Sequence, residues 1–392
     1  MRMTRWLLSL LMYGGCAGGP GDKDSAADSG LPVGGTAACL EDWSDGVQPV
    51  DPDGPDTQIH SAVAFDGDRL WFTWNRPNAA AGFDVWRSIT DCAGDTLASP
   101  LALSEADDVE IDPTIAFSDA GVLVVWTGST DAGLDIRSRV LDAGGSPVTE
   151  VSPFSASRAG EPVSGNATLP AAVGDGDGFV LAGSWGHPDA PAFQAFVVRL
   201  GPDGEPVADA EDVELDPTRG QTYVDVALEA GEPRVVWQED GTDTVDPVAW
   251  SAAPGTTPTL LAEPGARPAV VVAESGRWEA WDDNAGRVWI RRPDGASSAL
   301  ELGGGFHHTP QLSATGDTVA VLTMEVDSGI YNRLRLSVVS ASGEIEDVPL
   351  TAAAAPSVYE ASLALVDDTH AVVAWQEGEN PAFRAYAEWV SW

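Results

Sequence analysis

Basic residues are scarce in this chain of 392 residues. Lysine occurs once, at Lys23, and 20 lysines and arginines stand against 61 aspartates and glutamates, which leaves a formal net charge of −41. A nucleic-acid-binding surface needs a basic patch that neutralises phosphates, so this composition argues against DNA or RNA as a partner. An anionic membrane surface would repel the folded chain for the same reason.

A hydrophobic run long enough to span a membrane is also missing at the N-terminus. The apolar stretch there covers about eight residues, from Trp6 to Tyr13, whereas a transmembrane helix takes about 20. Because Arg2 and Arg5 precede it, the stretch suits the apolar core of a secretory signal peptide. We therefore expect residues 1–15 to be a cleaved signal.

The sequence Gly-Gly-Cys at residues 14–16 resembles the lipobox of bacterial lipoproteins, although Tyr13 stands where that motif usually has leucine. The resemblance implies that Cys16 is lipidated and becomes the new N-terminus. No acidic residue follows it directly, which favours anchoring at the outer membrane, on the periplasmic or the cell-surface side. An ordinary secretory signal with an incidental cysteine is the alternative. Residues 16–35, rich in Gly, Asp, Ser and Ala, are predicted to be a flexible tether.

Cysteine is rare, with three in the chain. If Cys16 carries a lipid, Cys39 and Cys92 remain as a pair, and export to an oxidising compartment predicts a disulfide between them. Two cysteines without clustered histidines do not make a zinc site.

One pattern repeats along the chain, and each copy contains an anchor residue. An apolar run, an Asp/Gly/Ser turn and a second β-rich run lead to the anchor, and two further runs separated by a Gly-containing turn complete the unit. Four short antiparallel strands per unit predict an all-β, seven-bladed β-propeller over residues 36–392. We expect the anchors to pack inside the blades, and their number favours seven blades over the alternative of eight. The anchors are spaced by 52, 59, 52, 44, 42 and 52 residues: Trp74, Trp126, Trp185, Trp237, Trp281, Thr323 and Trp375.

The last unit lacks a fourth strand, because the chain ends with its third run at Trp392. An open sheet edge beside the first blade would be an exposed template for strand pairing. We expect a strand within residues 36–43 to close the ring by completing the seventh blade. Cys39 would then lie beside the first blade, where Cys92 occupies a turn.

These repeats resemble those of secreted bacterial β-propeller lipoproteins. The shared features are a proline-led apolar strand, a short Gly/Asp turn, a strand like Val124-Val125-Trp126, and a downstream arginine followed by a glycine turn. The resemblance covers roughly residues 56–392 and implies the architecture. It implies no particular function, because propellers serve binding, scaffolding and many chemistries.

The first strand of each unit should line the central channel, so that equivalent positions converge on one axis. Aligned on the anchors, these positions are rich in ionisable residues, and such a cluster in a concave mouth predicts a ligand site. We expect Arg267 to hold an anionic group, and His60 and His308 to exchange protons with Asp112 or Glu360 orienting them. Unrelated solvated residues at loop ends are the alternative. The candidates are His60, Asp112, Tyr223, Arg267, His308 and Glu360, with Pro170 in the third unit and a one-residue ambiguity toward Thr309 and Tyr359 in the last two.

Signatures of catalysis and metal binding are missing. The chain has no G-x-S-x-G, H-E-x-x-H, C-x-x-C, Walker or sialidase Asp-box motif, so we assign no catalytic residue, metal or cofactor. The better candidate for a calcium loop is DPDGPD at residues 51–56.

Composition and pattern together favour a monomeric, lipid-anchored platform without enzymatic activity, which binds a protein or glycan partner. The alternative is a glycan hydrolase or lyase with its site at the channel mouth. Carboxylates with perturbed pKa values at the mouth would favour the enzyme, and exposed aromatic side chains would favour the binding protein.

Overall fold

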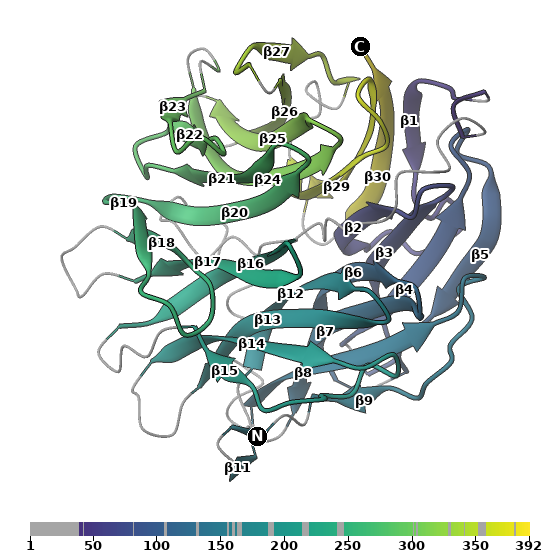
Figure 1. The fold of residues 1–392 in the computed structure, drawn as a ribbon. Helices are drawn as coiled ribbons and strands as arrows, with labels where there is room; N and C mark the ends of the chain where they lie inside the picture. Colours follow the sequence, from purple (N-terminus) through teal and green to yellow (C-terminus); the bar gives the residue numbers. More distant parts are fainter. Residues whose placement is uncertain are drawn as a thin grey trace.

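The computed structural model is a seven-bladed β-propeller, in which seven four-stranded antiparallel sheets form a ring (Figure 1). The predicted signal peptide and tether, and with them Cys16, lie outside the described residues. No helix in the described part of the chain has the length and apolar character to cross a membrane. The structure describes residues 39–392 except for 42, 81, 106–107, 131–132, 155–156, 159–160, 163–166, 187–191, 214–218, 241–246, 301, 303–304, 328–330, 341, 352–357 and 380–381.

Each blade is an antiparallel sheet, and in blades 1 to 6 the four strands follow one another in sequence order from the inside outward. Blade 1 holds β2 (Ile59–Phe65), β3 (Leu70–Pro77), β4 (Phe83–Thr90) and β5 (Thr96–Ala102). Blade 2 holds β6 (Glu110–Ser118), β7 (Gly121–Thr130), β8 (Gly133–Leu141) and β9 (Ser152–Pro153). Blade 3 holds β12 (Ala167–Asp175), β13 (Gly178–Gly186), β14 (Phe193–Leu200) and β15 (Glu211–Asp212). The short hairpin of β10 (Ser157–Arg158) and β11 (Glu161–Pro162) lies between blades 2 and 3 in sequence.

The remaining blades follow the same plan. Blade 4 holds β16 (Gln221–Glu229), β17 (Glu232–Glu239), β18 (Val248–Ala252) and β19 (Thr259–Ala262). Blade 5 holds β20 (Ala266–Ala273), β21 (Gly276–Asp282), β22 (Val288–Arg291) and β23 (Ser297–Ala299). Blade 6 holds β24 (Phe306–Thr315), β25 (Thr318–Asp327), β26 (Tyr331–Val339) and β27 (Ile345–Val348). Blade 7 holds β28 (Val358–Leu365), β29 (His370–Glu379), β30 (Ala382–Ser391) and the N-terminal β1 (Gly46–Pro49).

The glycine turns of the repeat follow from backbone geometry. The glycine between the third and fourth strands of blades 1 to 6 has a φ between 69° and 85°, a region that a side chain rarely adopts. In blade 2, for example, Gly145 donates its N–H to the carbonyl of Asp142 over 2.8 Å and so closes the turn. The turn therefore fixes where the third strand ends and the outer strand begins.

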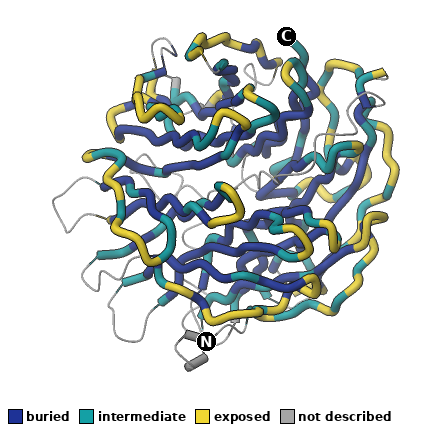
Figure 2. Tube along the Cα trace, in the orientation of Figure 1, coloured by how far each residue is buried: buried dark blue, intermediate teal, exposed yellow. Residues whose placement is uncertain are grey.

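The hydrophobic core consists of layers between neighbouring blades, because each sheet buries one face against the next. The inner strands are buried and the outer strands and turns are exposed (Figure 2). The six anchor tryptophans are at most 4% exposed, which confirms their predicted packing role. The indole N–H groups of Trp74 and Trp237 have no hydrogen-bond partner within the described chain, so these two side chains stabilise the fold by apolar contact.

The ring closes through β1, which pairs antiparallel with β30 and lies beside it in Figure 1. The register joins Gly46 to Trp389 and Pro49 to Tyr386. The predicted closure by an N-terminal strand is confirmed, but its predicted position at residues 36–43 is wrong. Cys39 and Leu40 form a turn of helix, and the strand follows it. Residues of this outermost strand alternate between half-buried and exposed positions. The strand therefore contains no apolar run by which it could be found in the sequence.

The predicted disulfide is present between Cys39 and Cys92, whose Cα atoms are 5.2 Å apart. Both residues belong to the apolar cluster between blades 7 and 1. Trp43 follows in the same segment, and its ring lies edge-on against His370 of β29 with centroids 4.8 Å apart. The N-terminal segment is thus attached to both blades that meet at the closure.

Candidate functional site

Every inner strand carries one residue with a left-handed backbone, and these seven residues occupy equivalent places. Their φ angles lie between 41° and 55°, although none of them is glycine. Each marks a β-bulge, where the pairing of the inner strand with the second strand shifts its register. Such a conformation costs roughly 1–2 kcal/mol in a residue with a side chain, so the packed ring must enforce it. The seven are His60, Asp112, Leu169, Tyr223, Arg267, Thr309 and Glu360.

Five of the six ligand-site candidates from the sequence occupy these bulge positions. In the sixth unit Thr309 is the bulge residue and His308 is the residue before it, which settles the one-residue ambiguity. The third unit has Leu169 there instead of Pro170.

The third blade departs from the predicted alignment because its anchor is displaced. In six blades the residue before the bulge residue pairs with the residue after the anchor, as Ile111 does with Thr127. In blade 3, Thr168 pairs with Ser184, so Gly183 takes the anchor position and Trp185 lies two residues beyond it. The ring of Phe196 lies against Gly183 and fills the space that an anchor side chain takes elsewhere.

The bulge residues share one end of the ring. The inner strand of a blade starts at the end where the second strand stops and the third begins, because the sheet is antiparallel. All seven bulge residues lie in the first half of their strands, and neighbouring inner strands contact each other around the ring. They therefore form a circle at this end, which we name the strand-start face.

Three of the bulge residues are in direct contact and form what we name the axial cluster: His60, Asp112 and Glu360. Nδ1 of His60 lies 2.8 Å from Oδ1 of Asp112 and 3.0 Å from Oε2 of Glu360. The side chains of His60 and Asp112 are 1% and 3% exposed, and that of Glu360 is 14% exposed. The cluster joins blades 7, 1 and 2, and Glu360 is its most accessible member.

Burial and the neighbouring charges set the protonation of this cluster. The pKa of Glu360 is raised to about 7: burial is the largest cause, His60 lowers the pKa, and the nearby Asp112 carboxylate raises it. Because one imidazole faces two carboxylates, a proton on Glu360 relieves the excess negative charge. The cluster can thus accept or release a proton near neutral pH.

A recurring hydrogen bond holds the bulge residues in place, and sequence analysis missed it. The backbone N–H of the bulge residue donates to a side chain of the preceding blade in four junctions of the described chain. His60 donates to Oε1 of Gln376 over 3.0 Å, and Arg267 donates to Oε1 of Gln238 over 3.0 Å. Leu169 and Thr309 donate in the same way to Thr127 and Asp282, over 3.2 and 3.3 Å. In each case the acceptor is the residue after an anchor tryptophan, so polar residues at that repeated position were the available signal.

Arg267 lies on the circle, but its guanidinium is already paired. Its Nε and one terminal nitrogen donate to the two carboxylate oxygens of Asp282 over 2.7 and 2.8 Å. Asp282 is fully buried, so the pair compensates a charge that would otherwise be isolated inside the protein. The fork that we expected to hold an anionic ligand is therefore occupied by Asp282 in this structure.

The other candidates have separate surroundings. Tyr223 is buried, with 5% of its surface exposed. His308 is half-buried, and its Nδ1 lies 2.8 Å from the Thr309 hydroxyl. Its ring lies 6.1 Å from that of Phe306, which begins β24 and is 38% exposed. The strand-start face thus carries an exposed aromatic side chain on blade 6.

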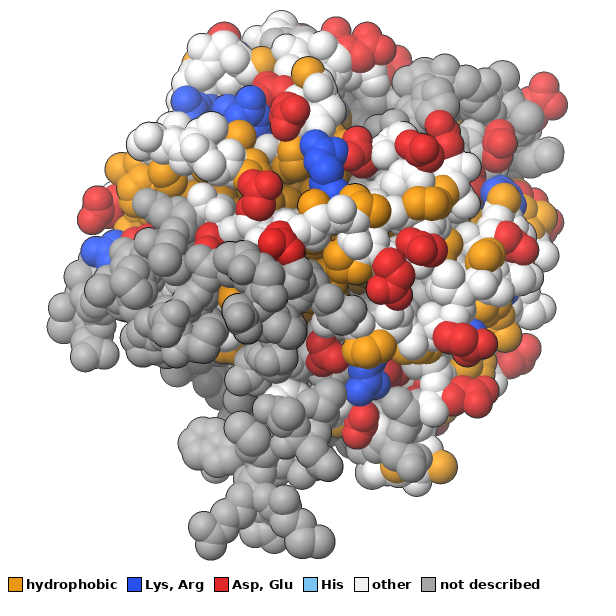
Figure 3. All heavy atoms as spheres, turned by 60° about the horizontal axis from the view of Figure 1, so that its bottom comes forward, with side chains coloured by type: hydrophobic (Ala, Val, Ile, Leu, Met, Phe, Trp, Pro, Cys, Tyr) orange, Lys and Arg blue, Asp and Glu red, His pale blue; other side chains and the backbone are white. Residues whose placement is uncertain are grey.

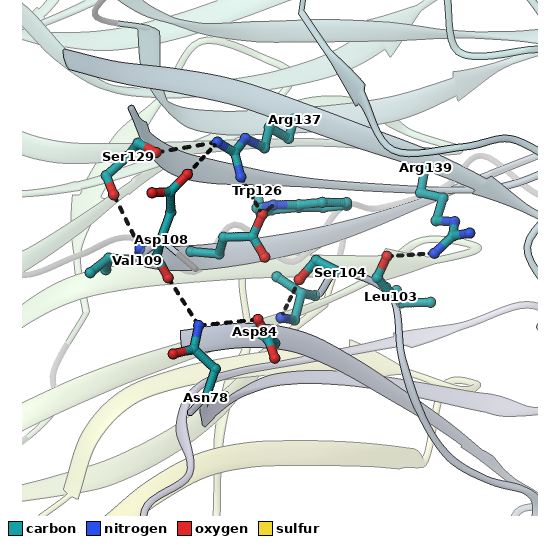
Figure 4. A network of polar contacts seen from close by, with 12 residues as sticks. Asn78, Asp84, Leu103, Ser104, Asp108, Val109, Trp126, Ser129, Arg137 and Arg139 are labelled. Carbon is teal, nitrogen blue, oxygen red and sulfur yellow. Dashed lines mark hydrogen bonds and ion pairs between the residues drawn. The ribbon is translucent and has the colours of Figure 1, made fainter. Parts of the chain in front are cut away.

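A polar network lies beside the axial cluster between blades 1 and 2 (Figure 4). Arg137 reaches Oε1 of Glu110 over 2.7 Å and Oδ2 of Asp108 over 3.2 Å. The anchor Trp126 donates its indole N–H to the same oxygen of Glu110 over 3.0 Å. Glu110 precedes Asp112 by two residues, so this network fixes the start of the strand that presents Asp112.

Two of the three carboxylates of the calcium candidate at residues 51–56 are engaged by arginines. Asp51 is 1% exposed and pairs with Arg76, whose Nε lies 2.5 Å from Oδ2. Asp56 pairs with Arg384. In the part of the chain that the structure describes, no group of three or more His, Cys, Asp or Glu side chains has an arrangement that could hold a metal ion.

On the face in Figure 3, Asp and Glu side chains are scattered over the visible surface, with few Lys or Arg side chains among them. Several arginines are instead used between blades. Arg139 donates to the carbonyl of Leu103 over 2.7 Å, and Arg87 donates to that of Gly145 over 2.8 Å, each in a neighbouring blade. These arginines therefore hold neighbouring blades together, and the accessible surface retains an excess of negative charge.

The chain matches no protein-family model and no curated protein. Among solved structures it is similar to the polysaccharide lyase Uly1, with a TM-score of 0.55 and 10% identity over 94% of this chain and 98% of that one. It is also similar to a protein of unknown function from Dyadobacter fermentans, with a TM-score of 0.53 and 10% identity over 88% and 99% of the two chains. A puromycin hydrolase gives a TM-score of 0.53 and 16% identity over 92% of this chain, which spans about half (55%) of that protein. At these identities the similarities show the fold alone: the chain is a seven-bladed β-propeller.

Proposed function

We propose that this propeller binds a glycan on its strand-start face, with the axial cluster as the centre of the site. The observation that carries the proposal is the meeting of His60, Asp112 and Glu360, from three blades, at one imidazole nitrogen. Sugar hydroxyls pair well with such groups, because carboxylates accept hydrogen bonds and a neutral imidazole can donate one and accept one. Glu360, at 14% exposure, is the member that a ligand reaches first.

An aromatic side chain on the same face supports a glycan as the ligand. Phe306 leaves 38% of its surface exposed on blade 6, next to the blade that carries Glu360. An exposed ring offers an apolar platform to the C–H face of a sugar, and exposed aromatic residues are common at binding surfaces.

The proposal places the protein outside the cytoplasm of the cell that makes it. Cys16 carries the lipid, residues 16–35 form the tether, and the propeller acts as a monomeric binding platform at the outer membrane. The disulfide between Cys39 and Cys92 supports an extracytoplasmic location, because such bonds persist in oxidising compartments.

Hydrolysis or elimination of the bound glycan is the second candidate, and the pKa of Glu360 favours it. A carboxyl group with a pKa of about 7 can serve as a general acid near neutral pH. Asp112 supplies a second carboxylate, which contacts the same nitrogen of His60, and paired-carboxylate chemistry uses two such groups. The polysaccharide lyase Uly1 shares the fold, which makes a glycan substrate compatible with this architecture.

A glycan array probed with the full chain tests the proposal. The expected result is binding to a restricted set of glycans, which Asp112→Asn weakens and the exposed control Glu346→Gln does not. Incubation of each bound glycan with the protein, followed by mass spectrometry, separates binding from cleavage. An array without any glycan dependent on Asp112 would overturn the proposal and favour a protein partner.

A further inference from the structure

Arginines on the strand-start face are neutralised by buried carboxylates. In four ion pairs there, the carboxylate side chain is at most 4% exposed. One member of each pair lies where an inner strand begins or a second strand ends, which places the pair on this face. The pairs are Arg76 with Asp51, Arg137 with Glu110, Arg219 with Glu239 and Arg267 with Asp282.

These four arginines are not free to bind an acidic ligand. Arg267 donates to both carboxylate oxygens of Asp282, over 2.7 and 2.8 Å, and Asp282 is fully buried. An acidic group that drew Arg267 away would leave this carboxylate charged and unpaired in the interior, which is strongly unfavourable. The other three carboxylates are buried as well, so the same argument holds for their arginines. The positive charge on the circle of bulge residues is therefore used inside the protein.

Carboxylates also face three exposed arginines that lie farther from this circle, between the second and third strands of their blades. Arg287 pairs with Asp283, Arg384 pairs with Asp56, and Arg333 lies directly opposite Glu325 in the register of β25 and β26. Exposed pairs of this kind are weak, because solvent screens them. Each nevertheless places a negative charge beside the positive one, so the rim of the face offers little net attraction to an anion.

The centre of the face carries an excess of negative charge. Both carboxylates of the axial cluster face the single imidazole of His60. Asp240 follows β17 on blade 4 and is exposed. It accepts hydrogen bonds from Gln238 over 2.9 Å and from Thr222 over 3.5 Å, and these uncharged donors leave its negative charge in place. The potential at the centre is therefore negative, and the net charge of −41 reinforces it.

We propose that the site at the axial cluster takes glycans without acidic groups and rejects uronates and sulfated sugars. The inference rests on the glycan binding proposed above and names its ligand class. A sugar hydroxyl can donate to Asp112 or Glu360 without electrostatic repulsion, because it carries no charge. A uronate or sulfate group at the same place would meet like charge, and such a contact is an effective way to exclude a wrong ligand.

A glycan array probed with the full chain tests this selectivity. It carries uncharged glycans of several classes, and the hexasaccharides of glucan, mannan and galactan are present in three forms that differ at C6. These forms carry a primary alcohol, a carboxylate, or the methyl ester of that carboxylate. For each backbone that binds, we expect the carboxylate form to bind at least about tenfold more weakly than the ester, which has nearly the same shape but no charge. High salt should narrow this difference, because it screens the repulsion.

The variant Asp282→Asn tests the role of the buried pairs. It leaves the guanidinium of Arg267 without its anionic partner, so the face gains a positive charge. The affinity for the carboxylate form should rise about tenfold, as expected for one new charge-assisted hydrogen bond. Arg267→Ala/Asp282→Asn lacks the guanidinium and should show no such gain. If Asp282→Asn does not fold, the comparison of the three forms with the wild type decides alone.

The outcomes separate this selectivity from the proposed function. A carboxylate form that binds the wild type as tightly as its ester, and is weakened by Asp112→Asn, would overturn the selectivity and leave glycan binding intact. Rejection of the ester together with the carboxylate would show exclusion by size and would also overturn it. An array on which no glycan binds would overturn glycan binding itself.

Discussion

Nδ1 of His60 lies 3.0 Å from Oε2 of Glu360, and this contact joins the first and last blades of the ring across 300 residues of sequence. The same nitrogen lies 2.8 Å from Asp112, so the second blade is part of the contact. Ring closure and the candidate site thus share the same residues. Changes in the axial cluster should affect both stability and binding, and the two effects need separate measurements.

The pH dependence of stability should report on Glu360. Its pKa is about 7 in the folded protein and near 4.5 as a free group, so the folded state binds more protons than the unfolded state between these values. The free energy of unfolding should therefore fall as the pH rises from about 4.5 to 7 and then level off, by at most about 3 kcal/mol from this group. Glu360→Gln cannot ionise and should lose this dependence.

Urea unfolding of the wild type and Glu360→Gln between pH 4.5 and 8 measures the difference. Glu346→Gln serves as the control, because its carboxylate is exposed and makes no hydrogen bond or ion pair within the described chain. Parallel pH profiles for the wild type and Glu360→Gln would show that Glu360 has an ordinary pKa in the folded protein.

Much of the ring could be predicted from the sequence, because the repeat records the geometry of one blade. The anchors and glycine turns fixed the strands, and the alignment placed five of six candidates at the bulges. The predicted alignment of the third unit was wrong, because Trp185 lies two residues beyond the anchor position and Phe196 fills the space there. Only the packing of the folded chain reveals this difference. The predicted position of the closing strand was wrong, because an exposed edge strand has no apolar run that would mark it in the sequence.

Most hydrogen bonds between blades could not be predicted, because their partners are far apart in sequence, for example 27 positions for Thr309 and Asp282 and 300 for His60 and Glu360. The sequence led us to expect Asp112 or Glu360 beside a histidine, but the meeting of both carboxylates at one nitrogen of His60 depends on which bulge side chains turn toward each other. The pairing of Arg267 with Asp282 was missed for the opposite reason, since Asp282 follows an anchor and its role in the repeat was not recognised.

We expect Arg267 to contribute mainly to the stability of the fold, through its ion pair with Asp282, rather than to ligand binding. Arg267→Ala leaves Asp282 buried without its partner, and loss of one member of a buried pair costs about 3–5 kcal/mol. The double variant Arg267→Ala/Asp282→Asn removes the stranded charge and should recover part of this loss. Urea unfolding of the single and double variants decides the question. An unfolding free energy of Arg267→Ala equal to that of the wild type would mean that the ion pair contributes nothing.

Removal of the disulfide should lower stability without abolishing ring closure. Cys39 and Cys92 are separated by 53 residues, and a loop of this size corresponds to roughly 4 kcal/mol in the chain-entropy description, with real bonds often giving less. Cys39→Ser/Cys92→Ser should unfold at lower urea concentration but retain β1 on β30, as protection of their amides in hydrogen exchange would show. Two free thiols in the protein purified from the cell envelope would rule out the bond.

Lipidation should depend on Cys16. The wild type should partition into the membrane fraction, and Cys16→Ser should move to the soluble fraction with altered electrophoretic mobility. Cys39→Ser retains the lipid site and should stay with the membrane, which makes it the matched control. A Cys16→Ser protein that stays in the membrane fraction with unchanged mobility would refute the anchor.

The dissociation constant of the tightest array glycan, measured for the wild type and for Asp112→Asn, tests the central claim most directly. Asp112 is 3% exposed, so the variant removes one charge from the axial cluster and leaves the surface unchanged. The account predicts about tenfold weaker binding by Asp112→Asn, as for the loss of a hydrogen bond to a charged group. Equal dissociation constants for the two proteins, with both folded, would contradict the assignment of the axial cluster as the glycan site.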